Sequence, residues 1–158
     1  MKNVILFSVI LFALGSCRKD PTIIPVIVEP LPEFKTMDLI QFTIEVPQAW
    51  TYTSWTSISS SYAGQINFSE TEFATFYLGW ESDSLNVDNA AHDISYTSID
   101  GKSAKIVKAI DPENGTTGVH IPILVSGWIN KFTLSANDIS ASNQEKLLTA
   151  IATLDFVN

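Results

Sequence analysis

Histidine is the commonest general base in proteins, and this 158-residue chain has two histidines. His92 precedes Asp93, and His120 lies between Val119 and Ile121 in an apolar stretch. General acid–base catalysis needs a reactive group within hydrogen-bond reach, and the sequence contains no G-x-S-x-G, H-E-x-x-H or G-x-x-x-x-G-K motif. We therefore predict structural histidines and no catalytic residue. The alternative is a hydrolase whose motif-less site combines His92, Asp93 and a serine.

An acidic stretch, ESDSLNVDNAAHD from Glu81 to Asp93, could offer carboxylate and amide oxygens to Ca²⁺. Its spacing does not match the EF-hand loop, because Leu85 stands where a ligand is needed and glycine is absent. Charge runs of this kind usually face water. We predict a solvated segment with no metal site and no cofactor. Glu81, Asp83 and Asp88 are the residues that would test a cation site.

The tripeptide DSL within this stretch resembles the short acceptor motif of a general protein O-glycosylation system in some Gram-negative bacteria. The resemblance implies a glycan on Ser84.

Aromatic residues crowd the segment from Trp50 to Tyr62. Trp50 follows Pro47 at the end of a predicted strand, and we expect it in the core. Trp55 lies in the Ser/Thr-rich stretch TSWTSISSSY, where we expect an exposed ring. Exposed planar rings stack on sugars or anchor protein partners, so Trp55 is the candidate binding residue.

Cys17 is the only cysteine, so the chain has no partner for a disulfide. The chain begins with MKNVILFSVILFALGSC, in which Lys2 precedes an apolar run from Val4 to Leu14. That run is shorter than the roughly 20 residues of a membrane-spanning helix and is typical of a secretory signal. Its end resembles the bacterial lipobox, which implies cleavage between Ser16 and Cys17 and acyl chains on Cys17. Two or three chains anchor a protein firmly, because each buried methylene contributes about 0.8 kcal/mol.

Charge limits the classes of partner. Nine Lys and Arg residues oppose seventeen Asp and Glu residues, which gives a net charge of −8. Such a chain repels phosphate backbones and anionic lipid surfaces, so we predict no nucleic-acid partner. We predict membrane contact through the lipid alone. Arg18 and Lys19 after the cysteine are not the paired acids of inner-membrane retention, so the outer membrane is favoured.

Three segments follow from these patterns. Residues 1–16 are the predicted lipoprotein signal peptide. Residues 17–35 form a tether from the lipidated cysteine, with prolines at positions 21, 25, 30 and 32, and such density favours an extended semi-rigid linker. The alternative is that IIPVIV pairs as an edge strand. Residues 36–158 form one globular domain.

Period-2 alternation predicts short strands through most of this domain. Phe42, Ile44 and Val46 alternate with polar residues and end at Pro47, and further strands are expected at 63–69 and 73–80. Asp100-Gly101 supplies the positive φ angles of a type I′ turn and predicts a hairpin of residues 96–99 and 103–110. A further strand should place Val119, Ile121, Ile123 and Val125 on one face.

The C-terminal segment predicts a strand around Phe132 and Leu134, a helix and a last short strand. Ser142 and Glu145 have capping-box spacing, and Leu147, Leu148 and Ile151 fall at the spacing of one helical face. These patterns predict a helix from Asn143 to Ala152. Leu154 and Phe156 would form the last strand. A second helix is expected between Asp83 and Asp93, with Leu85, Val87 and Ala91 facing inward.

The stretches FTIEVPQAW, IDGKSAKIV and NKFTL with NQEKLLTAIATLDF together resemble the PsbP-like family of α/β/α sandwich domains. The likeness covers residues 42–156. It implies an α+β fold, a mostly antiparallel sheet with helices on both faces, and a role in binding or assembly. A β-sandwich is the alternative fold.

We therefore predict a non-enzymatic envelope lipoprotein that binds a protein or a small ligand. The alternatives are the motif-less hydrolase and a carbohydrate-binding module that uses Trp55.

Overall fold

The computed structural model describes residues 34–55, 61–80, 82–124 and 131–157. The predicted signal peptide, Cys17 and the predicted tether up to residue 33 lie outside the described residues. The first strand begins at Phe34, two residues before the predicted start of the domain.

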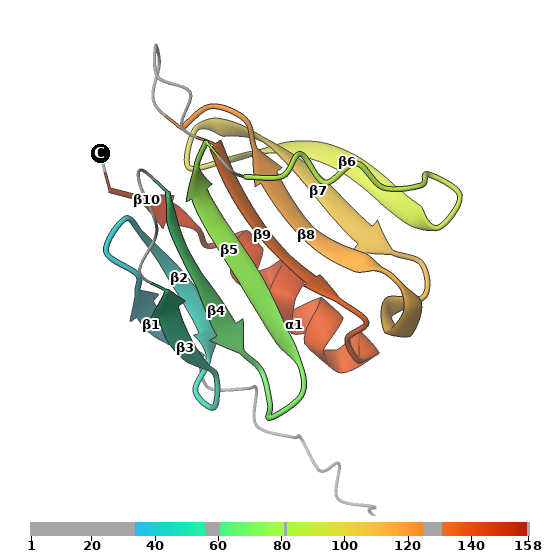
Figure 1. Ribbon diagram of the computed structural model, residues 1–158, viewed down its shortest axis with the longest axis horizontal. Helices are drawn as coiled ribbons and strands as arrows, with labels where there is room; N and C mark the ends of the chain where they lie inside the picture. Colours follow the sequence, from blue (N-terminus) through green and yellow to red (C-terminus); the bar gives the residue numbers. More distant parts are fainter. Residues whose placement is uncertain (1–33, 56–60, 81, 125–130, 158) are drawn as a thin grey trace, which may run out of the picture.

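Two antiparallel sheets make up most of the described chain (Figure 1). The smaller sheet has the strand order β1-β2-β10, and the larger sheet has the order β3-β4-β5-β9-β8-β7-β6. The strands of the smaller sheet are β1 (Phe34–Asp38), β2 (Phe42–Pro47) and β10 (Asp155–Phe156). Those of the larger sheet are β3 (Thr51–Trp55), β4 (Tyr62–Asn67), β5 (Phe73–Gly79), β6 (His92–Ile99), β7 (Lys102–Ala109), β8 (Thr116–Ile121) and β9 (Lys131–Asn137).

The alternation in β2 is confirmed, because Phe42, Ile44 and Val46 are fully buried. The ring of Phe42 meets those of Phe76 and Phe132 edge-on, at centroid distances of 5.3 Å and 4.9 Å. These two residues belong to β5 and β9 of the larger sheet. The smaller sheet therefore packs on one face of the larger one, and the two sheets share a single apolar core.

The described residues contain one α-helix, α1 (Ala141–Ile151), and a short 3₁₀ helix, η1 (Pro112–Asn114). Helix α1 packs beside β2 on the same face of the larger sheet (Figure 1). Leu147 and Ile151 are buried, as predicted. The N-cap is Ser140, not the predicted Ser142. The carboxylate of Glu72, from the turn before β5, accepts the Ser140 N–H and so holds the helix start two residues earlier.

The predicted helix between Asp83 and Asp93 does not form. Residues 82–88 are irregular, and they cross the face of the larger sheet opposite α1; we call residues 82–88 the strap. Thr133 Oγ1 and Lys105 Nζ donate hydrogen bonds to strap carbonyls that a helix would use internally. Leu85 takes a positive φ of 48° and is buried, as predicted for its side chain.

The architecture is therefore a mostly antiparallel, sandwich-like fold that contains more sheet and less helix than the sequence predicted. Among the described residues, no helix covers the face that carries the strap.

The hairpin of β6 and β7 is confirmed, with φ angles of 48° at Asp100 and 69° at Gly101. Strand β8, in contrast, ends at Ile121, because Pro122 has no N–H to continue the ladder. Ile123 is therefore not on the buried face of that strand but 60% exposed. Val125 lies outside the described residues.

Candidate functional site

His92 binds backbone groups through both ring nitrogens. Its Nε2 accepts the N–H of Thr116 at 3.1 Å, so the proton lies on Nδ1, which donates to the carbonyl of Asp88 at 2.8 Å. Asp93 is the next residue of β6 and projects from the opposite face. The geometry therefore does not assemble a His92–Asp93 dyad, and His92 instead joins the turn before β6 to the start of β8.

His120 is buried on the outer side of β8. Its Nδ1 lies 3.1 Å from Thr133 Oγ1, whose hydroxyl proton is donated to the carbonyl of Asp83. The hydroxyl oxygen therefore accepts from Nδ1–H. Burial, followed by the positive charges of Lys131 and Lys105, lowers the pKa of His120 below its usual value. A neutral His120 thus helps to hold the strap on the sheet.

Two described carboxylates of the acidic stretch bind backbone N–H groups. Within the part of the chain that the structure describes, no group of three or more His, Cys, Asp and Glu side chains could hold a metal ion. The carboxylate of Asp83 accepts the N–H of Leu85 at 3.1 Å, and that of Asp88 accepts the N–H of Ala90 at 2.9 Å. Glu81 lies outside the described residues. Ser84 is partly buried, and its carbonyl accepts a hydrogen bond from Lys105 Nζ.

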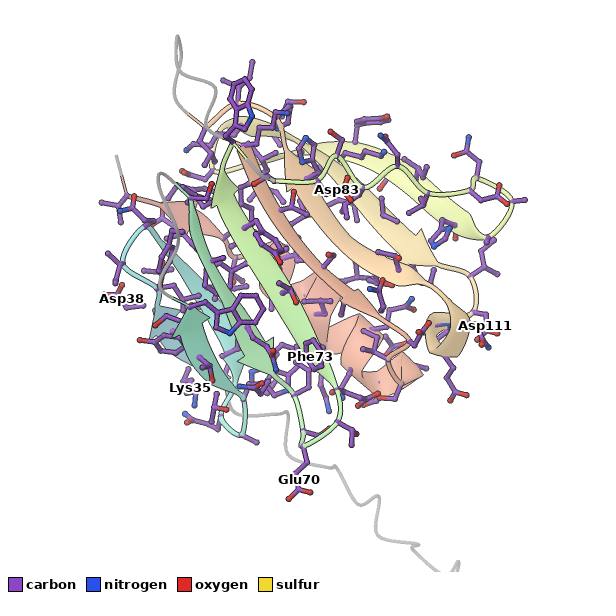
Figure 2. The ribbon with its side chains drawn as sticks, viewed as in Figure 1. Lys35, Asp38, Glu70, Phe73, Asp83 and Asp111 are labelled. Atoms are coloured by element: carbon purple, nitrogen blue, oxygen red, sulfur yellow. The ribbon has the colours of Figure 1, made fainter. Side chains whose placement is uncertain are left out.

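Among the described segments, only the strap crosses the other face of β3, β4, β5 and β9 (Figure 1). Strand register places its side chains in three cross-strand rows. The rows are Thr51–Asn67–Phe73, Thr53–Gln65–Thr75–Ser135 and Trp55–Ala63–Tyr77–Thr133. Continuing the β5–β9 register two residues beyond Thr75 and Ser135 adds Asn137 to the first row. We call these twelve residues the outer patch. Figure 2 shows Phe73 near one end of this face and Asp83, in the strap, near the other.

Aromatic rings stand at both ends of the outer patch. Trp55 is 40% exposed, as predicted, and its ring lies edge-on to that of Tyr77 at a centroid distance of 6.5 Å. Phe73, on the opposite row, is 44% exposed. Trp50 is buried, and its ring packs on that of Phe68 at a centroid distance of 4.1 Å, which confirms its predicted place in the core.

Between the rings, amides and hydroxyls form hydrogen bonds along the surface. Gln65 Nε2 donates to Asn67 Oδ1 at 2.6 Å, and Asn67 Nδ2 donates to Thr51 Oγ1 at 3.4 Å. None of the twelve residues carries a charge, although the whole chain has a net charge of −8. The outer patch can therefore stack and hydrogen-bond, but it offers no charged group for acid–base catalysis.

The sequence indicated Trp55 as a binding residue, but it did not indicate the amides of Gln65 and Asn67 in the neighbouring rows. Strand alternation could have indicated Thr53 and Gln65. In TYTSW, Thr53 is two residues from Trp55 and so shares its face, and in YAGQIN, Gln65 is two residues from Ala63, the cross-strand partner of Trp55. Tyr77 comes beside Trp55 only through the pairing of β4 with both β3 and β5.

A pocket lies on the other side of the larger sheet from the outer patch, between α1 and the β6–β7 hairpin. It has a volume of about 230 Å³, and Ile99, Ile106, Leu148 and Ile151 make most of its lining apolar. It contains no ionisable side chain.

No protein-family model, curated protein or solved structure matches the chain. Among the described residues, no helix is both long and apolar enough to cross a membrane.

Proposed function

We propose that this chain is a lipid-anchored, non-enzymatic protein of the bacterial envelope whose sheet domain binds a ligand on the outer patch. The observation that carries the binding role is the exposed Trp55 ring beside Tyr77, next to two uncharged rows that hold the amides and most of the hydroxyls of the outer patch.

The anchor rests on the N-terminal sequence. A short apolar run leads directly to Cys17, and the Pro-rich residues that follow suit a spacer between membrane and domain. Acyl chains on Cys17 would supply the membrane affinity. The outer membrane remains the favoured location, because basic residues follow the cysteine.

A Cys17→Ala variant tests the anchor. We expect the wild-type protein to enter the detergent phase in a two-phase partition and the variant to stay in the aqueous phase. Ser8→Ala is the matched control, because it keeps both the apolar run and the cysteine. Equal partition of wild type and Cys17→Ala would contradict the anchor.

Membership of the PsbP-like family is part of the proposal. Its support is the order of elements: FTIEVPQAW contains β2 and Trp50, IDGKSAKIV forms the hairpin turn and β7, and β9, α1 and β10 follow in turn at the end. The family's association with binding and assembly agrees with a patch that lacks charged groups.

A neutral glycan is the ligand class that the outer patch favours. Aromatic faces pack against the apolar faces of sugar rings, while amides and hydroxyls satisfy sugar hydroxyls. A protein partner recognised through charge finds no complementary group on these twelve residues. Retention on an uncharged polysaccharide is therefore the direct readout.

The binding experiment uses the mature protein in detergent and two insoluble uncharged polysaccharides, chitin and cellulose. We expect retention on at least one of them and a loss of about tenfold or more in Trp55→Ala, the usual effect of removing an anchoring ring. Tyr52→Ala is the control, because Tyr52 belongs to the same strand and is 45% exposed but projects from the other face.

Two results would redirect the proposal. Trp55-dependent capture of an envelope protein, with no glycan retained, would indicate a protein partner. Equal behaviour of Trp55→Ala, Tyr52→Ala and wild type toward every ligand would exclude the outer patch as the binding site.

A further inference from the structure

Strand β6 is a long edge strand of the described sheet. It spans eight residues and, among the described strands, pairs only with β7, at the end of the seven-stranded sheet opposite β3. Ser95, Tyr96, Thr97 and Ser98 are exposed, and Tyr96 reaches 74%. A strand of this length presents a row of unpaired backbone groups to any strand that can align with it.

The hairpin determines which backbone groups face the free side. Ile99 and Lys102 close a two-residue turn, so they form a hydrogen-bonded pair, and every second residue of β6 then bonds to β7. The bond from Ile110 N–H to the carbonyl of Ala91 continues the same odd-numbered series. His92, Ile94, Tyr96 and Ser98 therefore direct their N–H and C=O groups outward.

Nothing in β6 protects this edge. Natural edge strands are usually guarded by proline, lysine, a bulge or short length, and β6 has none of these. Its one charged residue, Asp93, lies opposite Lys108 of β7. The strap adds no strand to this edge. Its one described hydrogen bond to β6 runs from His92 Nδ1 to the carbonyl of Asp88, and the carbonyls of residues 83–85 accept from Thr133 and Lys105, on β9 and β7.

We propose that β6 pairs antiparallel with β6 of a second copy of this chain, about a two-fold axis through Ser95. A two-fold axis perpendicular to the sheet keeps every side chain on its own face, so residues of equal parity must pair. Centred on Ser95, the register joins Ile94 to the partner's Tyr96 and His92 to the partner's Ser98, each twice. All four outward-facing residues then complete their hydrogen bonds.

Self-complementarity is the reason for choosing a second copy as the occupant. The register through Ser95 places Ile94 opposite the partner's Tyr96, and the two-fold axis repeats this pair. A β-branched side chain opposite an aromatic one is a favourable cross-strand pair. The same register sets Asp93 opposite the partner's Thr97, so like charges do not meet. A register centred on Tyr96 leaves His92 without a partner. The pairing does not depend on the lipid anchor or on the outer patch.

Engineered cysteines in the full chain test this register, with Cys17→Ala as the background so that one thiol remains. Across the axis, the two Ser95 residues form a non-hydrogen-bonded pair with Cα atoms about 4.5 Å apart, within disulfide range. Ser95→Cys should therefore form a disulfide-linked dimer under mild oxidation. Thr97→Cys is the matched control: it is exposed on the same face, but its two copies would lie about 14 Å apart.

Light scattering on the same background chain gives the second readout. We expect twice the monomer mass, and we expect monomers for Tyr96→Lys, because a lysine at an exposed edge position opposes pairing without touching the core. A monomeric background chain, equal cross-linking at positions 95 and 97, or an undiminished dimer in Tyr96→Lys would each overturn the proposal. None of these results bears on glycan retention or detergent partition.

Discussion

At the scale of single residues, the carboxylate of Glu72 connects two segments that lie far apart in the sequence. Glu72 lies in the turn between β4 and β5 and accepts hydrogen bonds from the Ser140 N–H, the Ser140 hydroxyl and Asn143 Nδ2. Burial acts to raise the pKa of Glu72, but these hydrogen bonds outweigh it and the pKa lies below its usual value. The charged carboxylate therefore caps α1 from another element.

Replacing Glu72 by Gln should lower the free energy of unfolding by about 1 kcal/mol at pH 7, the usual effect of losing a helix cap. A carboxyl group with a lowered folded-state pKa stabilises above its ordinary pKa, 4.5, and loses that contribution as the pH falls through the folded value. Urea unfolding at pH 7 and in acid should therefore show the difference shrinking below pH 4.5.

Glu70→Gln is the control for this change. Glu70 belongs to the same turn but points into solvent (Figure 2), so its replacement should leave the free energy of unfolding unchanged. A pH-independent effect of Glu72→Gln would contradict the capping role.

His120 predicts a second, separate pH window. Because its folded-state pKa is lowered from 6.5, the unfolded chain binds the proton more readily. The stability that depends on a neutral His120 is fully present above pH 6.5 and declines as the pH falls from there toward the folded value. Urea unfolding between pH 7 and pH 5 should show this decline in wild type and a smaller one in His120→Asn. Identical slopes would show that His120 does not titrate on unfolding.

At the scale of elements, the β6–β7 hairpin is attached to the end of the chain. The carboxylate of Asp100 forms an ion pair with Lys102 and accepts the N–H of Phe156 at 3.2 Å. Lys102 Nζ lies 5.3 Å from the centroid of the Phe156 ring. The ion pair and the hydrogen bond lower the pKa of Asp100. The turn therefore helps to position β10 against β2.

Gly101→Ala measures how much the positive φ angle at this turn costs in the free energy of unfolding when the residue is not glycine. An added Cβ meets no atom within 4 Å, so the cost comes from the positive φ of 69° and should be about 1 kcal/mol. Thermal unfolding followed by circular dichroism measures it. Gly118→Ala is the contrasting variant, because its Cβ would come within 2.3 Å of the Leu134 carbonyl oxygen and within 2.7 Å of Ser135 Cα. We expect a much larger loss there, and equal losses at the two positions would contradict this account.

At the scale of the whole molecule, one apolar core joins both sheets and the helix. Phe42 of the smaller sheet contacts Phe76 and Phe132 of the larger sheet and Phe156 at 5.9 Å. Because the two sheets have no separate cores, neither should unfold alone.

Phe42→Ala should lower the free energy of unfolding by about 3–5 kcal/mol, because it leaves a cavity between the sheets. Tryptophan fluorescence and far-ultraviolet circular dichroism should give one coincident transition in wild type and variant. Phe42→Leu should cost less, since it fills part of the volume. Two separated transitions would show that the sheets unfold independently.

Local patterns in the sequence determined much of the secondary structure. The alternation around Phe42, the Asp100-Gly101 turn and the helical spacing of Leu147 and Ile151 depend on neighbours along the chain, and the structure confirms each of them. Burial of Trp50 and exposure of Trp55 were predicted from their immediate neighbours, Pro47 before Trp50 and the Ser/Thr-rich stretch around Trp55, and both are confirmed. Cys17 lies outside the described residues, and its lipidation stays a prediction from the sequence alone.

Contacts between distant segments decided the rest. Ser140 rather than Ser142 caps the helix because Glu72, 68 residues away from Ser140, binds there. The strap is not a helix because side chains of β7 and β9 bind its carbonyls. The outer patch, too, exists only where strand register aligns β3, β4, β5 and β9. A local pattern can specify which face a side chain takes, but only strand pairing can specify its neighbours on that face.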